Sequence, residues 1–161
     1  MTRRIIVYAI VLLLLAVIGE ESAFRITLWG VKPDLLLVFV VVVSLQGGPL
    51  SGGLSALAAG WMQAASLGIA VGSIIVSKAA SGLAAAQVEP HVVKENFLTS
   101  APVAFFATWV CEVVFFIFYP QVWGPRWPLQ VALESVLNAL VAPLLYLVLE
   151  YLAPRKESLT L

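Results

Sequence analysis

The chain has 161 residues, of which 61% are hydrophobic and 11% are charged, and its mean hydropathy is +1.02. A typical soluble domain has about 45–50% apolar and about 25% charged residues, so a chain this small and this apolar is predicted to be an all-α protein of the lipid bilayer. This composition excludes a soluble catalytic or nucleotide-binding domain, and the zero net charge gives no sign of nucleic-acid binding.

Six apolar stretches are predicted to form transmembrane helices in a single integral membrane domain that covers residues 1–161. One crossing takes about 20 helical residues, so six crossings use roughly 120 residues and leave only short loops. The predicted spans are residues 4–24, 32–46, 50–66, 70–86, 101–119 and 129–152.

The first stretch begins with a basic pair, Arg3 and Arg4, followed by the apolar run Ile5–Ile18. A signal peptide would have the same basic start and apolar run. No small-x-small cleavage site follows at the right distance, and the rest of the chain is itself apolar. We therefore expect a retained first span.

The second stretch opens with Lys32, Pro33 and Asp34. Proline suits the first turn of a helix, and an aspartate is favoured at the positive end of the helix dipole. The apolar run Leu35–Leu45 is short for a crossing, so the helix either begins before Lys32 or ends within the bilayer. A re-entrant second run would leave five spans and put the termini on opposite sides. Residues 46–49 (Gln-Gly-Gly-Pro) predict a turn.

The distribution of basic residues favours six spans with both termini in the cytoplasm. With six spans, one side of the membrane carries Arg3, Arg4, Lys94, Arg155 and Lys156, and the other carries Arg25, Lys32 and Arg126. Trp123 and Trp127 lie at the predicted edge of the last span, where an interfacial aromatic belt is expected.

Small residues recur at every fourth position of the third span, at Gly52, Ala56 and Gly60. Such a face lets helix backbones approach closely within a membrane. We favour packing against neighbouring helices of the same chain. A seam for another subunit, including a second copy of this chain, is the alternative.

Ionisable and amide side chains within spans are functional candidates, because burying them in a bilayer is costly. The candidates are Lys78, Glu112, Glu134, Asn138 and Gln63. Lys78 and Glu112 lie at similar predicted depths, so we expect a buried ion pair that fixes helix register. A proton or ion relay would need a longer chain of such groups.

No catalytic constellation is evident, and we expect neither an enzyme nor a bound cofactor or metal. The sole histidine, His91, lies in a predicted loop, and no aspartate is predicted in the interior of a span, since Asp34 lies at the start of one. The sole cysteine, Cys111, lies in an apolar span, so a disulfide framework and a Cys/His metal site are excluded.

The segment from Lys32 to Ala86 resembles the rod shape-determining protein MreD family. That family has a basic residue followed by Pro-Asp or Pro-Asn before an apolar helix, then a Gly-Pro turn, a glycine-rich helix with glutamine near its end, and a spaced glycine pair. A last helix with asparagine and proline at fixed spacing follows. The matching residues here are Lys32, Pro33, Asp34, Gly48, Pro49, Gly60, Gln63, Gly68, Gly72, Asn138 and Pro143. Ala64 stands where the family often has aspartate, so no role of that aspartate is carried over.

The resemblance implies a non-enzymatic scaffold of the cell elongation machinery in the bacterial cytoplasmic membrane. Its expected partner is MreC, a bitopic coiled-coil protein, and through MreC it would couple MreB filaments to RodA and a class B penicillin-binding protein. The family is also similar to the six-helix substrate-binding component of energy-coupling-factor transporters. A vitamin-type small-molecule-binding component of a transporter is therefore the alternative function.

Overall fold

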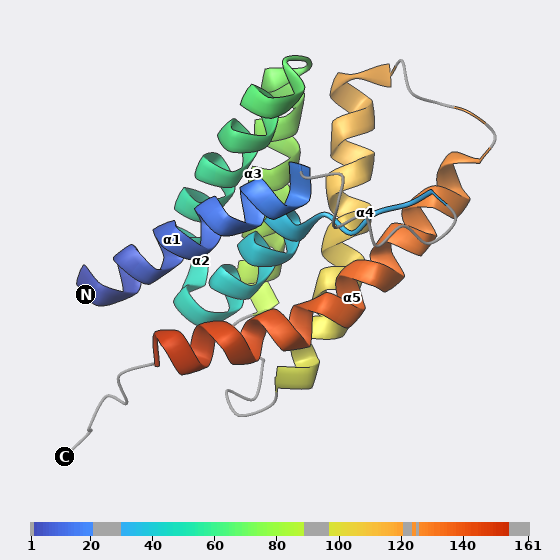
Figure 1. Cartoon of the computed structure of the whole chain (residues 1–161). Coiled ribbons are helices and arrows are strands. Elements are labelled where there is room, and N and C mark those ends of the chain that lie inside the picture. Colours follow the sequence, from blue (N-terminus) through green and yellow to red (C-terminus); the bar gives the residue numbers. More distant parts are fainter. Residues whose placement is uncertain (1, 21–29, 89–96, 121–123, 125, 155–161) are drawn as a thin grey trace.

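The computed structural model describes residues 2–20, 30–88, 97–120, 124 and 126–154. Within these ranges the regular structure is helical and contains no strand (Figure 1). The elements are α1 (Thr2–Glu20), α2 (Leu35–Leu67), α3 (Val71–Val88), the short 3-10 helix η3 (Phe97–Thr99), α4 (Ser100–Phe118) and α5 (Trp127–Leu152). The predicted all-α fold is confirmed.

Four helical segments of the described chain are long and apolar enough to cross a membrane: α2, α3, η3 together with α4, and α5. Large apolar side chains cover their outer faces; Trp61, Phe106 and Leu140 are each about two-thirds exposed. Such an exposed apolar surface suits lipid, because soluble monomers rarely expose contiguous apolar patches larger than a few hundred Å². These features fit a multi-pass membrane protein.

Helix α2 combines the predicted second and third spans and contains a sharp reversal at Gly48. Gly48 has φ 73° and ψ −169°, which is not helical, and Pro49 follows it. A Cβ atom added at Gly52 would lie 3.2 Å from the Cα of Ser44, whereas a straight helix separates residues eight apart by about 12 Å. The two halves of α2 therefore fold back on each other (Figure 1), and the turn predicted at residues 46–49 is confirmed.

The first half of α2 lies in the centre of the helical bundle. Every residue from Leu36 to Gln46 is buried, and the valines from Val40 to Val42 are fully so. A helix that is apolar on all sides belongs in the interior of a protein or membrane. The helix begins at Leu35, so it does not extend before Lys32. This helix can be short because other helices surround it. A segment within the membrane does not have to cross the bilayer completely where protein, and not lipid, encloses it.

The second half of α2 packs antiparallel to α3 through a close approach of their backbones. The connecting turn uses Gly68, whose φ of 68° is favourable only for glycine. A Cβ atom at Gly60 would lie 2.9 Å from the Cα of Ile75, and one at Gly82 would lie 3.2 Å from the Cβ of Ala56. The face formed by Gly52, Ala56 and Gly60 is therefore covered within the chain.

The start of α1 lies beside the end of α5. Arg4 donates from Nε to the carbonyl oxygen of Ala153 at 3.1 Å. Nearby, the Tyr8 hydroxyl donates to Oε1 of Gln46 at 3.2 Å, and Nε2 of Gln46 donates to the Tyr146 carbonyl at 3.3 Å. The described ends of the chain therefore meet at one end of the bundle.

The helix boundaries agree with the predicted spans except at the N-terminal side of the chain. The observed bounds of α3, α4 and α5 differ from the predicted ranges 70–86, 101–119 and 129–152 by no more than two residues. The predicted first span ended at Phe24, but residues 21–24 lie outside the described ranges. The predicted loop residues 89–96 and the basic residues 155 and 156 also lie outside them.

Candidate functional site

Asp34 is the centre of a hydrogen-bonded group that we call the polar junction, formed by Asp34, Lys78, Thr108 and Asn138. Its Oδ1 accepts the backbone N–H of Leu37 at 2.9 Å and thereby caps the N-terminus of α2. Its Oδ2 accepts from the Lys78 ammonium at 2.5 Å. The Lys78 side chain is 1% exposed and that of Asp34 is 16% exposed. A single carboxylate thus both starts α2 and neutralises a buried lysine of α3.

Asn138 extends the junction to the last two helices. Its Oδ1 accepts the backbone N–H of Asp34 at 2.9 Å, and its Nδ2 donates to the Thr108 hydroxyl oxygen at 2.9 Å. Thr108 in turn donates to the carbonyl of Ala104 at 2.8 Å. Asn138 and Thr108 are both completely buried. The junction therefore joins α2, α3, α4 and α5 through bonds that leave its buried polar groups satisfied.

The predicted ion pair between Lys78 and Glu112 is wrong, because Lys78 binds Asp34 instead. The two predicted partners have similar depths, but similar depth does not make two helix faces meet. From the sequence, Asp34 was predicted at the positive end of the helix dipole and Pro33 in the first helical turn. The helix begins only at Leu35, and the cap at Asp34 lies against α3 and α5.

A second feature, which we call the acidic cavity, lies beside the junction. One cavity of about 250 Å³ is lined by Lys32, Glu112, Trp127, Gln130 and Glu134, with further wall residues Gly30, Val31, Phe115, Phe116, Tyr119 and Val131. A second cavity of about 220 Å³ shares Lys32, Glu112 and Glu134 with the first. A third, of about 140 Å³, also shares Glu112. Three hollows therefore adjoin around one carboxylate.

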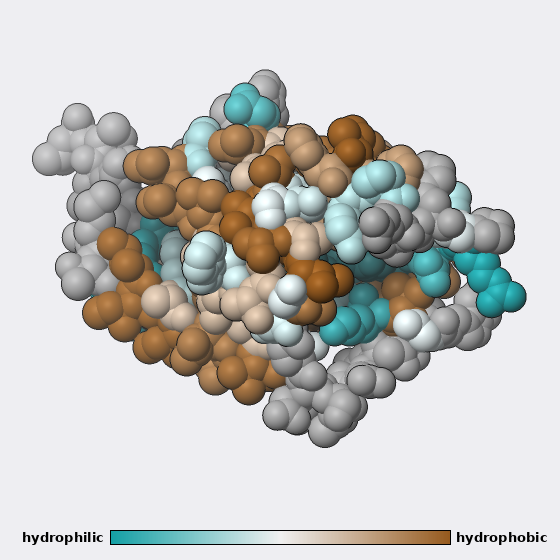
Figure 2. All heavy atoms as spheres, turned by 90° about the horizontal axis from the view of Figure 1, so that it is seen from above, coloured by the Kyte–Doolittle hydropathy of each residue, from teal (hydrophilic) through white to brown (hydrophobic). Residues whose placement is uncertain are grey.

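The acidic cavity lies at the end of the bundle where α2 turns into α3, because Leu67 and Ile69 line the third hollow. Figure 2 shows this end from above, with hydrophilic residues in a recess and hydrophobic residues over much of the outer surface. Gln63 lines the second and third hollows together with Asp34. The junction thus forms part of the cavity wall.

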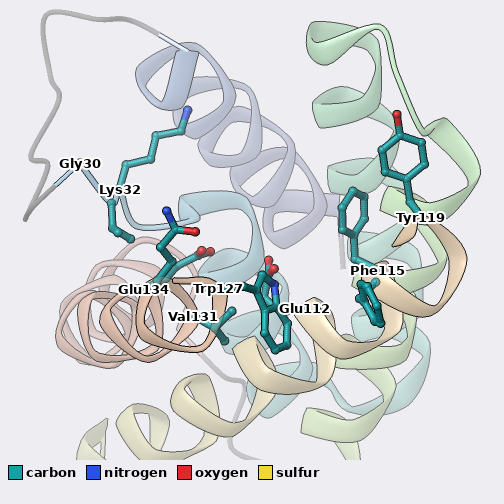
Figure 3. A pocket seen from close by; sticks show the side chains of 11 residues that line it. Gly30, Lys32, Glu112, Phe115, Tyr119, Trp127, Val131 and Glu134 are labelled. Carbon is teal, nitrogen blue, oxygen red and sulfur yellow. The ribbon is translucent and has the colours of Figure 1, made fainter. Parts of the chain in front are cut away.

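Glu112 of α4 and Glu134 of α5 point into the same space (Figure 3). The Trp127 indole forms a hydrogen bond with Glu112. Lys32 extends away from both carboxylates, and its ammonium donates to the carbonyl of Gly19 at 3.2 Å. Within the described ranges the only ion pair is that of Lys78 with Asp34. Neither glutamate therefore has a described cationic partner within ion-pair distance.

Several of these residues are candidates from the sequence, but their contacts with one another were not predicted. Asp34 and Asn138 meet in the junction, and Gln63 lies beside it. Glu112 and Glu134 meet at the cavity. The role of Lys32 and Trp127 as wall residues was missed; their positions at the edges of predicted spans were the one available signal.

Four other residues that carry the family resemblance are not among the described residues that form the junction or line the three hollows. Pro49 follows the reversal of α2, Gly68 ends α2, and Gly72 lies in the first turn of α3 with no atom close to the position of a Cβ. Pro143 lies inside α5. These residues shape turns and helix direction and contribute no atom to the junction.

The described residues hold no cluster of three or more His, Cys, Asp or Glu side chains that could bind a metal ion. Cys111 is buried and lines the third hollow. The arrangement can therefore hold helices together at the junction and offer carboxylates to a ligand at the cavity.

No family model matches the chain, and neither the curated proteins nor the solved structures give a match.

Proposed function

We propose that this protein is a non-enzymatic scaffold in the bacterial cytoplasmic membrane, with the role that its resemblance to the MreD family implies. It binds MreC and thereby helps to couple MreB filaments to lateral peptidoglycan synthesis by RodA and a class B penicillin-binding protein. Both ends of the chain lie in the cytoplasm. The fold is that of six helical segments, with the second enclosed by the others.

One observation carries this proposal. Two residues that define the resemblance, Asp34 and Asn138, lie 104 positions apart, yet the backbone N–H of Asp34 donates a hydrogen bond to the Asn138 side chain. Gln63, a third such residue, lines two of the hollows together with Asp34. Residues that match a family pattern by chance would have no reason to converge at one point of the fold. Their convergence supports the interpretation that the pattern records one shared architecture.

The junction also suits a scaffold. A buried polar network in which every member is satisfied fixes one arrangement of the elements that it joins. Here the network joins four helices, so the outer surface that they present is rigid. A rigid, apolar outer surface can bind a partner's transmembrane helix by close packing without a large ordering cost.

The proposal is tested by replacing the MreD-family protein of a rod-shaped bacterium with this chain, carrying an affinity tag. We expect rod shape to be kept and a bitopic coiled-coil protein to co-purify from solubilised membranes. Asn138→Leu removes the bond to Asp34 and should lower both co-purification and the fraction of rod-shaped cells. Glu150→Gln, in the same helix but outside the junction, serves as the control. A chain that accumulates normally but recovers no such partner and leaves cells round would contradict the proposal.

The alternative, a small-molecule-binding component of a transporter, is favoured by the cavity of about 250 Å³ with its two carboxylates. A concave site with a few converging polar groups is the usual form of a ligand site. The same purification separates the two functions, because a transporter component would retain a metabolite and an energy-coupling partner in place of MreC.

A further inference from the structure

In the acidic cavity, two ionisable side chains face open space without a described basic partner. Glu112 and Glu134 come from different helices and both line the cavities of about 250 and about 220 Å³. The described ranges give neither of them a basic partner within 4 Å, because the single ion pair there is at the junction. A buried carboxylate without a counter-charge is costly.

The charge balance of the cavity favours a cation. Asp34 and Lys78 neutralise each other at the wall, which leaves two carboxylates and one lysine among the lining residues. That lysine, Lys32, is exposed, and its ammonium is already held by the Gly19 carbonyl. The described wall therefore holds two carboxyl groups inside the cavity, and the Lys32 ammonium points away from both of them (Figure 3).

Four aromatic side chains form much of the remaining described wall and favour an organic cation over a metal ion. Phe115, Phe116, Tyr119 and Trp127 line the same cavity as the two glutamates. Aromatic faces attract ammonium groups and also cover the apolar part of a ligand. Calcium takes six to eight oxygen ligands, and no cluster of three acidic, histidine or cysteine side chains exists in the described ranges.

We propose that the acidic cavity binds an organic ammonium ion, with Glu112 and Glu134 as its counter-ions and the aromatic wall around its apolar part. The cavity is smaller than the usual range of about 300–1,000 Å³ for ligand sites, so the ligand is small or contributes only its amine head. The inference rests on the cavity alone and not on the proposed scaffold function.

The test uses the purified full-length protein in detergent and a pair of probes that differ only in charge. Phenethylamine is cationic at neutral pH, and phenethyl alcohol has the same shape without the charge. We expect phenethylamine to raise the unfolding temperature in a saturable way and phenethyl alcohol to leave it unchanged at equal concentration. Equal shifts with both probes, or no shift with phenethylamine, would overturn the proposal.

Two substitutions locate the site. Glu134→Gln and Glu112→Gln keep the shape of each side chain and remove its charge. Each should weaken phenethylamine binding by about tenfold to hundredfold, because a hydrogen bond to a charged group usually changes an affinity by about that factor. Glu150→Gln, in α5 but outside the cavity walls, should bind like the unchanged protein. If both cavity variants bind phenethylamine as tightly as the Glu150→Gln control, the site is not the acidic cavity.

A last comparison identifies the natural source of the amine. The protein is placed in nanodiscs of phosphatidylethanolamine or of phosphatidylglycerol, which lacks an amine. Weaker phenethylamine binding in the ethanolamine lipid means that a lipid headgroup occupies the cavity. Equal binding in both lipids means that the cavity takes a free amine. Either result supports an ammonium site, provided that the two glutamate variants lose it.

Discussion

The polar junction and the acidic cavity share a wall but use charge in opposite ways. At the junction, the Lys78 ammonium lies 2.5 Å from Asp34, and Asn138 links that residue to Thr108. At the cavity, two glutamates of neighbouring helices face open space without a described cationic partner. Burial alone therefore does not decide the role of a charged residue. A paired charge maintains the architecture, and an unpaired one is available to a ligand.

The largest effect is expected when the junction loses its cation. Lys78→Met leaves the Asp34 carboxylate uncompensated, and breaking a buried pair in this way costs about 3–5 kcal/mol. The yield of monodisperse protein should fall sharply, as measured by fluorescence-detected size-exclusion chromatography. If Glu134→Gln lowers the yield as much as Lys78→Met does, the contrast between the two regions is wrong.

A second large effect is expected where helix backbones approach most closely. A Cβ atom at Gly60 would lie 2.9 Å from the backbone of Ile75, so Gly60→Ile should force α2 and α3 apart. Overpacking of this kind costs about 1–3 kcal/mol, and more where backbone must move. Gly53→Ala, in the same helix with nothing near its Cβ position, is the control. Normal yield and normal unfolding of Gly60→Ile would place this face outside the intramolecular packing.

A smaller effect is expected at the far edge of the junction. Thr108→Val removes the hydroxyl that accepts from Asn138 and leaves one buried amide N–H without a partner. An unsatisfied buried donor costs about 1–3 kcal/mol, less than an unpaired charge. The free energy of unfolding in a denaturant titration should therefore fall less for Thr108→Val than for Lys78→Met. The opposite order would make the amide bonds, and not the ion pair, the main support of the junction.

The smallest effect on stability is expected in the cavity. Glu134→Gln removes a carboxylate for which the described structure shows no cationic partner, so the unliganded protein should be as stable as the original or slightly more stable. Thermal unfolding without added amine measures this directly. A marked loss of stability would mean that Glu134 has a structural partner and that its charge is not free for a ligand.

Much of the fold follows from the sequence because apolar length and turn residues are local signals. The turn at residues 46–49 and the extents of α3, α4 and α5 were all predicted from neighbouring residues. The burial of the short helix beginning at Leu35 was not predicted, because a helix that is apolar on every side can face either lipid or protein. Only the packing of the other helices decides between them.

The site was less predictable because it depends on which helix faces meet. The sequence predicts Asp34 at the start of the second helix and, separately, a buried ion pair for Lys78. It could not show that the N-terminus of α2 lies against α3, so Glu112 was chosen as the partner on depth alone. The five polar candidates were found by residue type, but their division between junction and cavity required the tertiary structure.

Lys78 is assigned to the junction and Glu112 to the cavity. Two double-mutant cycles that share Lys78→Met test this assignment. One cycle combines it with Asp34→Asn and the other with Glu112→Gln, and the free energy of unfolding is measured for every variant in the same detergent. Residues in direct contact usually couple by about 0.5–3 kcal/mol. We expect coupling in that range for Asp34 and a clearly smaller value for Glu112. A coupling to Glu112 equal to or larger than that to Asp34 would contradict the account.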